Sequence, residues 1–252
     1  MDSRDRAMKQ ERPSQNETSI IPHSAIRNPH SEDFSRYDQK LEFILRNAAR
    51  IFAEKGYHST SMRDISRETG VSLAGLYYYC RSKEELLFLI QDNCFGRVLE
   101  RLEQRLAEAK DGVEKLRLVI ENHLSFFAAN MAEMKVLSHE ADSLEGEMYE
   151  HVSGKKQQYT SLVRRILSEV QQAEARGLEK IDLTVATYAL FGMMNWIYNW
   201  YDPRGKLSVN ELVGNITHLF LNGFLTGAMG EQLQFRPKSA KAERLSVWRA
   251  PQ

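Results

Sequence analysis

Three helix-start signals lie close together in the segment from Thr60 to Leu86, and they constrain the fold more than any other feature of the chain. Ser61 and Asp64 have the spacing of a capping box, with Asp in place of the usual Glu or Gln. Ser72 is an N-cap for a second helix, and Ser82 opens a capping box for a third. Each cap contributes about 1 kcal/mol, so this punctuation predicts a helix-turn-helix.

The second of these short helices is predicted to present an unusual outer surface. The first helix ends at Gly70, and Ile65, Val71 and Leu76 are spaced to meet on one side. The residues left facing outward or along the rim are Leu73, Ala74, Gly75, Tyr77, Tyr78 and Tyr79. Small residues allow approach to base edges, and hydroxyls reach phosphates, so we expect a DNA duplex as partner. The alternative is an ordinary buried cluster of three helices.

This region closely resembles the DNA-binding end of the TetR family of transcriptional regulators. The match extends from Leu41 to Leu89, and Cys80 stands where the family usually has Phe. The residues that carry it are Phe52–Ala53–Glu54–Lys55–Gly56–Tyr57, Thr60–Ser61–Met62–Arg63–Asp64–Ile65, Gly70–Val71–Ser72, Leu76–Tyr77–Tyr78–Tyr79 and Ser82–Lys83–Glu84–Glu85–Leu86.

The resemblance implies an all-α homodimeric repressor that binds a palindromic operator on double-stranded DNA. It implies an N-terminal three-helix DNA-binding domain and a larger helical domain for ligand binding and dimerisation, about nine helices in all. By motif position, the resemblance assigns phosphate contacts to Thr60, Ser61, Tyr77, Tyr79 and Lys83, with Ser72 as the N-cap of the reading helix. It assigns base edges to Met62, Leu73, Ala74, Gly75 and Tyr78.

Composition excludes several other classes of protein. The net charge is zero, and residues 38–91 hold eight Lys and Arg against seven Asp and Glu, so DNA binding depends on placement rather than on amount of charge. The two cysteines and the lack of a signal peptide or long apolar run favour a cytoplasmic protein without membrane association. The scattered histidines show no metal spacing, and we find no catalytic motif and expect no cofactor.

The order of patterns predicts four parts: a disordered arm over 1–37, the DNA-binding domain over 38–84, the ligand-binding and dimerisation domain over 85–230, and a flexible tail over 231–252. Apolar periodicity and capping signals predict helices over 38–56, 82–106, 113–130, 131–144, 147–176, 183–201 and 209–229 besides the two short ones. The last two are apolar on more than one face, which favours a homodimer interface that they form with their copies in a second chain. Central core helices of a monomer are the alternative.

Large, soft side chains are dense in the second domain, and Asn residues alternate with Trp on a helix predicted to be buried. We expect a ligand to contact Phe126, Phe127, Met131, Met134, Tyr159, Met193, Asn195, Trp196, Asn199 and Trp200. The runs 136–144, 194–208 and 219–223 resemble TetR regulators of fatty-acid and sterol breakdown. That resemblance implies an acyl-CoA effector, with Arg164, Arg165 and Arg204 as candidate phosphate partners.

Two other readings stay open. A TetR-type regulator of multidrug efflux would bind flat cationic drugs, and Glu140, Asp142 and Glu145 could supply the acids. A helical enzyme or scaffold would have no operator at all.

Overall fold

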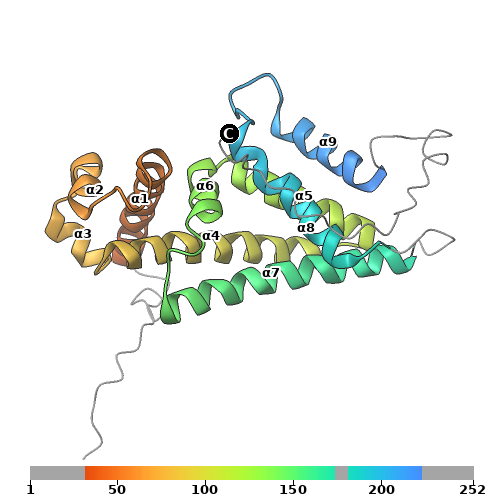
Figure 1. Ribbon diagram of the computed structural model, residues 1–252, viewed down its shortest axis with the longest axis horizontal. Helices are drawn as coiled ribbons and strands as arrows, with labels where there is room; N and C mark the ends of the chain where they lie inside the picture. The colour runs from red at the N-terminus through yellow and green to blue at the C-terminus, as the bar shows by residue number, and fades with distance from the viewer. Residues whose placement is uncertain (1–31, 174–180, 223–252) are drawn as a thin grey trace, which may run out of the picture. The chain divides into compact units, whose positions relative to one another are not determined.

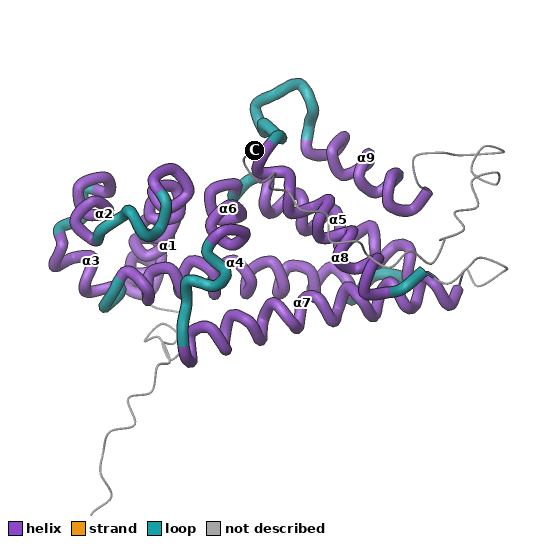
Figure 2. The backbone as a smooth tube through the Cα atoms, in the orientation of Figure 1, coloured by secondary structure: helices purple, strands orange, loops and turns teal. Residues whose placement is uncertain are grey.

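The computed structural model describes residues 32–173 and 181–222, which contain helices and no strand (Figures 1 and 2). The elements are α1 (Glu32–Lys55), α2 (Met62–Thr69), α3 (Leu73–Tyr79), α4 (Lys83–Leu106), α5 (Gly112–Ala128), α6 (Met131–His139), α7 (Gly146–Ala173), α8 (Leu183–Asn195), the 3-10 helix η2 (Trp196–Asn199) and α9 (Val209–Asn222). The predicted all-α class is confirmed. No helix within these residues is long and apolar enough to cross a membrane.

The chain divides into two compact units, Met1–Glu42 and Phe43–Gln252, and the description below concerns the second. Helix α1 begins at Glu32, six positions before the predicted start, so the expectation of disorder is wrong for residues 32–37. These residues continue the periodicity of the helix without Pro or Gly. The predicted arm over 1–31 and tail over 231–252 lie outside the described residues.

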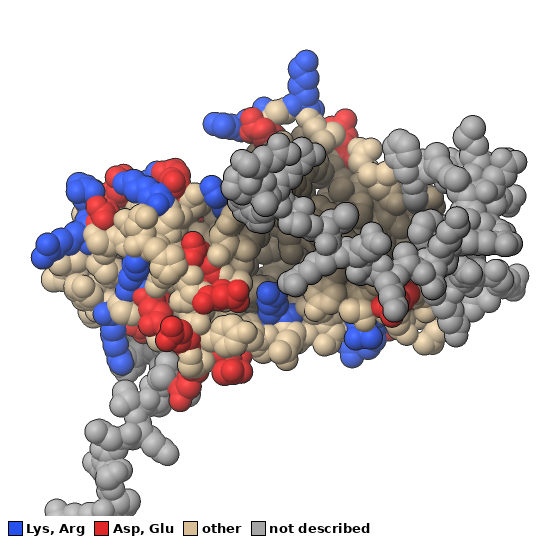
Figure 3. Space-filling model, viewed as in Figure 1, with Lys and Arg blue, Asp and Glu red and all other residues tan. Residues whose placement is uncertain are grey.

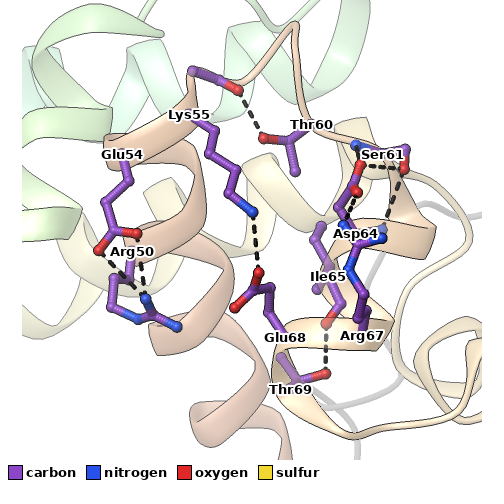
Figure 4. Close-up of polar contacts among 11 residues, drawn as sticks. Arg50, Glu54, Lys55, Thr60, Ser61, Asp64, Ile65, Arg67, Glu68 and Thr69 are labelled. Atoms are coloured by element: carbon purple, nitrogen blue, oxygen red, sulfur yellow. Dashed lines mark hydrogen bonds and ion pairs between the residues drawn. The ribbon is translucent and has the colours of Figure 1, made fainter.

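The predicted caps shape the segment from α2 to α4. Ser61 Oγ accepts a hydrogen bond from Asp64 N, and Asp64 Oδ2 accepts one from Ser61 N at 3.0 Å, so the capping box is complete (Figure 4). Ser72 Oγ accepts from Gly75 N at 3.0 Å. Ser82 Oγ accepts from Glu85 N at 3.0 Å, but the Glu85 carboxylate bonds Arg81 N rather than Ser82 N, so this third box is not reciprocal as expected.

Helices α4, α5 and α7 form the centre of the larger domain. Helix α4 lies against α5 and α7, and α5 in turn lies against α7 and α9 (Figure 1). Val98, Leu102, Ile120, Leu124 and Val163 are fully buried between these helices. The expected long helix after Ser82 is confirmed as α4, which continues from the end of the α2–α3 segment into this core.

Several helix ends differ from the predictions. Helix α6 ends at His139 rather than at residue 144, and α8 ends at Asn195 rather than continuing to residue 201. There the chain tightens into η2, with i to i+3 hydrogen bonding, before the Asp202–Pro203 turn. Ser208 and Glu211 form the predicted reciprocal cap of α9, while the expected continuation beyond Asn222 lies outside the described residues.

Gly70 is the residue that allows the chain to turn between α2 and α3, since its φ is +65°. We predict that Gly70→Ala lowers the free energy of unfolding by about 1–2 kcal/mol, the cost of placing Cβ in the left-handed region. The control is Gly154→Ala in α7, where a Cβ would meet nothing within 4 Å. It should stabilise by about 0.5–1 kcal/mol. Urea unfolding should show changes of opposite sign in the free energy of unfolding of the two variants. Equal changes would contradict the role given to Gly70 in the turn.

Candidate DNA-reading surface and effector cavity

Helix α3 has one buried face and one exposed face. Leu76 is fully buried, and Gly75 lies so near the preceding turn that a Cβ would meet Ser72 Oγ and Val71 Cγ1, each at 3.1 Å. Tyr77 and Tyr78 are 48% and 66% exposed, and Tyr79 is half-buried. Ala74 is exposed and Leu73 is partly exposed. The predicted set of small and phenolic side chains on α3 therefore forms one outward surface.

Two residues predicted to contact DNA face the interior instead. Thr60 is 3% exposed, and its hydroxyl donates to the Gly56 carbonyl oxygen at 2.8 Å, so it closes the turn between α1 and α2 (Figure 4). Met62 is 9% exposed and lies with Ile65 on the buried side of α2. Both assignments are corrected, because motif position shows neither the bond that turns Thr60 inward nor which face of α2 is covered. Ser61 is exposed, but its hydroxyl is engaged in the cap.

Lys83 is tied to the connection between α1 and α2. Its Nζ donates to the Tyr57 carbonyl oxygen at 2.8 Å and lies 4.3 Å from the centre of the Tyr57 ring. An ammonium group has three donors, so two remain for a phosphate. The predicted phosphate contact stays a prediction, and the structure adds a second role in fixing the start of α4.

Sequence analysis missed two cations on this surface. Arg63 and Arg81 are exposed, and within the described residues neither makes an ion pair. Arg67, in contrast, is paired with Asp64. Figure 3 shows basic and acidic side chains interspersed over the part of the visible face that holds α2 and α3. Single unpaired arginines rather than a basic field supply the charge available to phosphates.

A cavity of about 450 Å³ opens in the larger domain between α4, α5, α6, α7, α8 and η2. Its lining is apolar and aromatic with a few polar groups: Phe95, His123, Phe127, Met134, Leu137, Ser138, Ala141, Lys156, Tyr159, Thr160, Tyr188, Phe191, Gly192, Asn195, Trp196 and Tyr198. Among the described residues, Lys156 is the one Lys, Arg, Asp or Glu in this lining, and it is exposed. A small-molecule site typically has this composition and size.

Five of the ten predicted ligand contacts line this cavity: Phe127, Met134, Tyr159, Asn195 and Trp196. The other five are Phe126, Met131 and Met193, which pack against the core, and Asn199 and Trp200, which are exposed. Asn195 and Trp196 are also largely exposed, so the expectation of a buried helix carrying these amides is wrong. Arg164, Arg165 and Arg204 are exposed and do not line the cavity.

His123 is one of the cavity residues that sequence analysis did not predict. It is 2% exposed, and its Nδ1 lies 3.1 Å from the Tyr159 hydroxyl. Burial lowers the pKa of His123 to about 3, and the nearby Asn195 side chain opposes that shift only in part, so the imidazole is neutral. A single histidine in an amphipathic helix has no sequence pattern that reveals such a position.

The segment after α6 connects the cavity with the α1–α2 connection. Gln91 on α4 is 1% exposed, and its Nε2 donates to the Glu140 carbonyl oxygen at 3.0 Å. The Glu140 side chain accepts from the Ser143 hydroxyl at 2.7 Å and lies 3.9 Å from His58 Nε2. His58 follows Tyr57, the residue held by Lys83. Ala141 of this segment lines the cavity, so the cavity wall reaches the α1–α2 connection through few contacts.

His139, Glu140 and Asp142 do not form a metal site. Tyr198 OH lies 3.0 Å from His139 Nε2, and residues 32–173 and 181–222 contain no group of three metal-ligating side chains.

Comparison with known proteins decides the family. Residues 44–90 match "Bacterial regulatory proteins, tetR family", and residues 109–224 match "Tetracyclin repressor-like, C-terminal domain". The TetR family regulator PfmR from Thermus thermophilus is 30% identical, with 73% of this chain and 99% of that chain covered and a TM-score of 0.65. This chain belongs to the TetR family. Its members are transcriptional regulators, and α2 and α3 lie within residues 44–90, which match the TetR family.

Two further relatives of the TetR type bear on the cavity. The fatty acid metabolism regulator protein of Bacillus subtilis strain 168 is 27% identical over 184 residues, which cover 71% of this chain and 93% of that protein. AibR, solved in complex with isovaleryl coenzyme A and operator DNA, is 27% identical, with 71% of this chain and 97% of that chain covered and a TM-score of 0.64.

The neutral state of His123 predicts a pH dependence of stability. Its folded pKa lies below the unfolded value of 6.5, so the unfolded chain binds the extra proton and stability falls as pH falls below that value. Between pH 7 and pH 5 this residue should remove about 2 kcal/mol from the free energy of unfolding. Urea unfolding of the wild type and of His123→Phe at both pH values checks this prediction. The free energy of unfolding of the variant should decrease less between pH 7 and pH 5, because it lacks the contribution of His123. The same slope in variant and wild type would contradict it.

Proposed function

We propose that this chain is a homodimeric TetR-type repressor that holds a palindromic operator through α3 and the start of α4, and that an acyl-CoA thioester releases it. The observation that carries the proposal is an apolar cavity in a chain similar to AibR and to a fatty acid metabolism regulator. In the part of its lining that the structure describes, the one Lys, Arg, Asp or Glu is a lysine.

For DNA recognition, the α3 surface offers contact area with few donors. Leu73, Ala74 and Gly75 fit against thymine methyl groups, while the hydroxyls of Tyr77 and Tyr79 reach phosphates. Because few side chains can pair with base edges, we expect specificity to depend partly on DNA shape. Ser61, Ser72, Tyr78 and Lys83 complete the proposed contact set, joined by Arg63 and Arg81.

The dimer interface is proposed on α8 and α9. Large apolar residues are exposed on α8, in or directly after η2, and on α9: Val185 (64%), Tyr188 (63%), Trp196 (60%), Trp200 (53%) and Leu219 (39%). Such a collection of apolar side chains on one part of a chain typically marks a partner surface. A second copy of the chain would cover it and place two α3 helices about 34–36 Å apart, one turn of the duplex.

The charge of the cavity favours an acyl-CoA over a cationic drug. A drug cation needs an acid among aromatic side chains, but the lining contributed by residues 32–173 and 181–222 has none, and His123 is neutral. The exposed Lys156 amine suits a phosphate or phosphate-linked group outside, while Phe127, Met134 and Phe191 suit an acyl chain inside. A complete switch needs about 5.5 kcal/mol of differential affinity. Burying about 220 Å² of apolar surface supplies that amount at about 25 cal/mol per Å².

The coupling path is proposed along Ala141, Glu140 and Gln91. An acyl group that displaces Ala141 would move the Glu140 carbonyl, which is bonded to α4, and the Glu140 carboxylate, which lies near His58. One contact joins this segment to α4, and the other lies at the connection between α1 and α2. A small displacement there changes the spacing of two α3 helices in a dimer.

Removing Lys83 should weaken DNA binding without regard to sequence. We predict that Lys83→Met lowers affinity for operator and for random duplex alike and reduces the slope of log Kd against log salt by about 1. Gel-shift titration at several salt concentrations measures both. Lys83→Arg should restore most of the affinity, and Arg117→Met on the exposed side of α5 is the charge-matched control. An unchanged slope in Lys83→Met would remove this contact from the proposal.

Acyl-CoA thioesters should release operator DNA and raise the melting temperature, whereas cationic dyes should do neither. A panel of chain lengths at fixed protein and DNA concentration measures both responses, with free coenzyme A as the control. Gln91→Met should bind acyl-CoA normally yet release DNA less completely, because it breaks the bond to Glu140 while leaving the cavity intact. Gln158→Met, which loses an exposed contact to Glu103, should release DNA as the wild type does. Release by dyes alone would favour the efflux-regulator alternative.

A further inference from the structure

One polar atom at the cavity has no partner. His123 Nε2 is buried and makes no hydrogen bond within the part of the chain that the structure describes. The Nδ1 atom of the same ring is engaged with Tyr159, and His123 lines the cavity, so Nε2 is the ring nitrogen left for a ligand. The aromatic rings of Phe127, Tyr159 and Phe191 surround the imidazole with centroids 4.7, 5.9 and 6.0 Å away. These rings offer Nε2 no strong hydrogen-bond acceptor. The Asn195 side chain lies near the imidazole, but the structure has no hydrogen bond between it and Nε2.

The contact with Tyr159 determines whether the single ring proton of the neutral imidazole is on Nε2 or on Nδ1. Tyr159 is 3% exposed, and Nδ1 is the one hydrogen-bond partner of its hydroxyl among the described residues. If Nδ1 were the donor, the Tyr159 O–H and Nε2 would both be left unsatisfied. If the Tyr159 O–H donates to Nδ1, Nε2–H alone is unsatisfied. Buried unsatisfied groups are costly, so the second arrangement is favoured and Nε2 is a donor.

We propose that the effector places a carbonyl oxygen against His123 Nε2–H, and that Tyr159 is a positioning residue that fixes the imidazole in this tautomer. The inference rests on the proposed acyl-CoA effector and specifies the chemistry of its buried part. A saturated hydrocarbon chain would cover the donor without pairing it, whereas a carbonyl satisfies it. The cavity thus discriminates by a hydrogen bond as well as by shape, which gives larger differences between ligands than added apolar contact does.

Two groups of an acyl-CoA could supply this oxygen. One is the thioester carbonyl itself, and the other is a keto group farther along the acyl chain. Lys156 and Thr160 line the cavity from α7 together with Tyr159. The first source requires the thioester to pass the exposed Lys156 and reach the Tyr159–His123 pair. The second requires only the chain to reach it.

Three ligands of equal chain length separate these sources: octanoyl-CoA, S-octyl-CoA, which lacks the carbonyl, and 7-oxooctanoyl-CoA. If the thioester is the partner, the wild type should bind octanoyl-CoA about tenfold more tightly than S-octyl-CoA. If a keto group is the partner, those two should bind equally and 7-oxooctanoyl-CoA about tenfold more tightly. His123→Phe should abolish either preference, and His123→Gln, which keeps an N–H donor, should restore part of it.

Thr187→Val, which removes a buried hydroxyl outside the cavity lining, is the control for general destabilisation and should keep the preference. Nitrogen-15 NMR of the histidine side chains adds a readout that needs no ligand. Nε2 of His123 should carry the proton in the wild type, and Tyr159→Phe should populate the other tautomer. A wild-type ring protonated at Nδ1 overturns the donor assignment.

2-Octanone, a carbonyl without coenzyme A, distinguishes failure of this inference from failure of the proposed function. A shift of the His123 Nε2–H resonance by 2-octanone, with no binding of any coenzyme A ligand, would keep the carbonyl site and reject the acyl-CoA effector. Binding of all three coenzyme A ligands with identical relative affinities in wild type and His123→Phe overturns the carbonyl site and leaves the proposed effector standing. A resonance unmoved by every probe overturns the carbonyl site as well.

Discussion

A helix of seven residues is not stable by itself in water, and α3 is such a helix. Its position therefore depends on the groups that surround it: the Ser72 cap at its start, the fully buried Leu76 beneath it, and the left-handed turn at Gly70 before it. These contacts fix the backbone of α3 and thereby the direction in which its outer tyrosines point. A reading surface with few hydrogen-bond donors needs this rigidity, since contact with methyl groups and phosphates is productive only at close range.

The larger domain contains both a buried apolar core and a cavity beside it. Helices α4, α5 and α7 pack continuously, while α8 gives way to η2 at Asn195 beside the cavity. The wall on the other side is the segment after α6, which is held by a main-chain carbonyl to Gln91. A wall made of a short connection can shift at lower cost than a packed helix can. This short connection also carries the contacts that lead to His58.

The sequence predicted what is determined locally and missed what is determined by packing between distant segments. Ser61, Ser72 and Gly70 act within a few residues of themselves, so their roles were readable in advance. Met62 was misplaced because the face of α2 that is covered depends on α1 and α3. Thr60 was misplaced for a different reason, since motif position does not reveal its local bond to Gly56. The end of α8 had no Pro or Gly signal at Asn195, and the apolar run through Trp200 suggested one long helix. His123 acquires its character from Tyr159, Phe191 and Asn195 on α7 and α8, a combination that no spacing within α5 reveals.

The placement of the indoles has a practical consequence. The chain has three tryptophans, and two of them, Trp196 and Trp200, lie in or directly after η2, with Trp196 lining the cavity. Both are more than half exposed in the single chain. Their emission is therefore sensitive to whatever excludes solvent from this one short stretch. The two indoles are intrinsic fluorescent probes at the junction of the cavity and the exposed apolar surface. Their emission can report binding at either place without an attached dye.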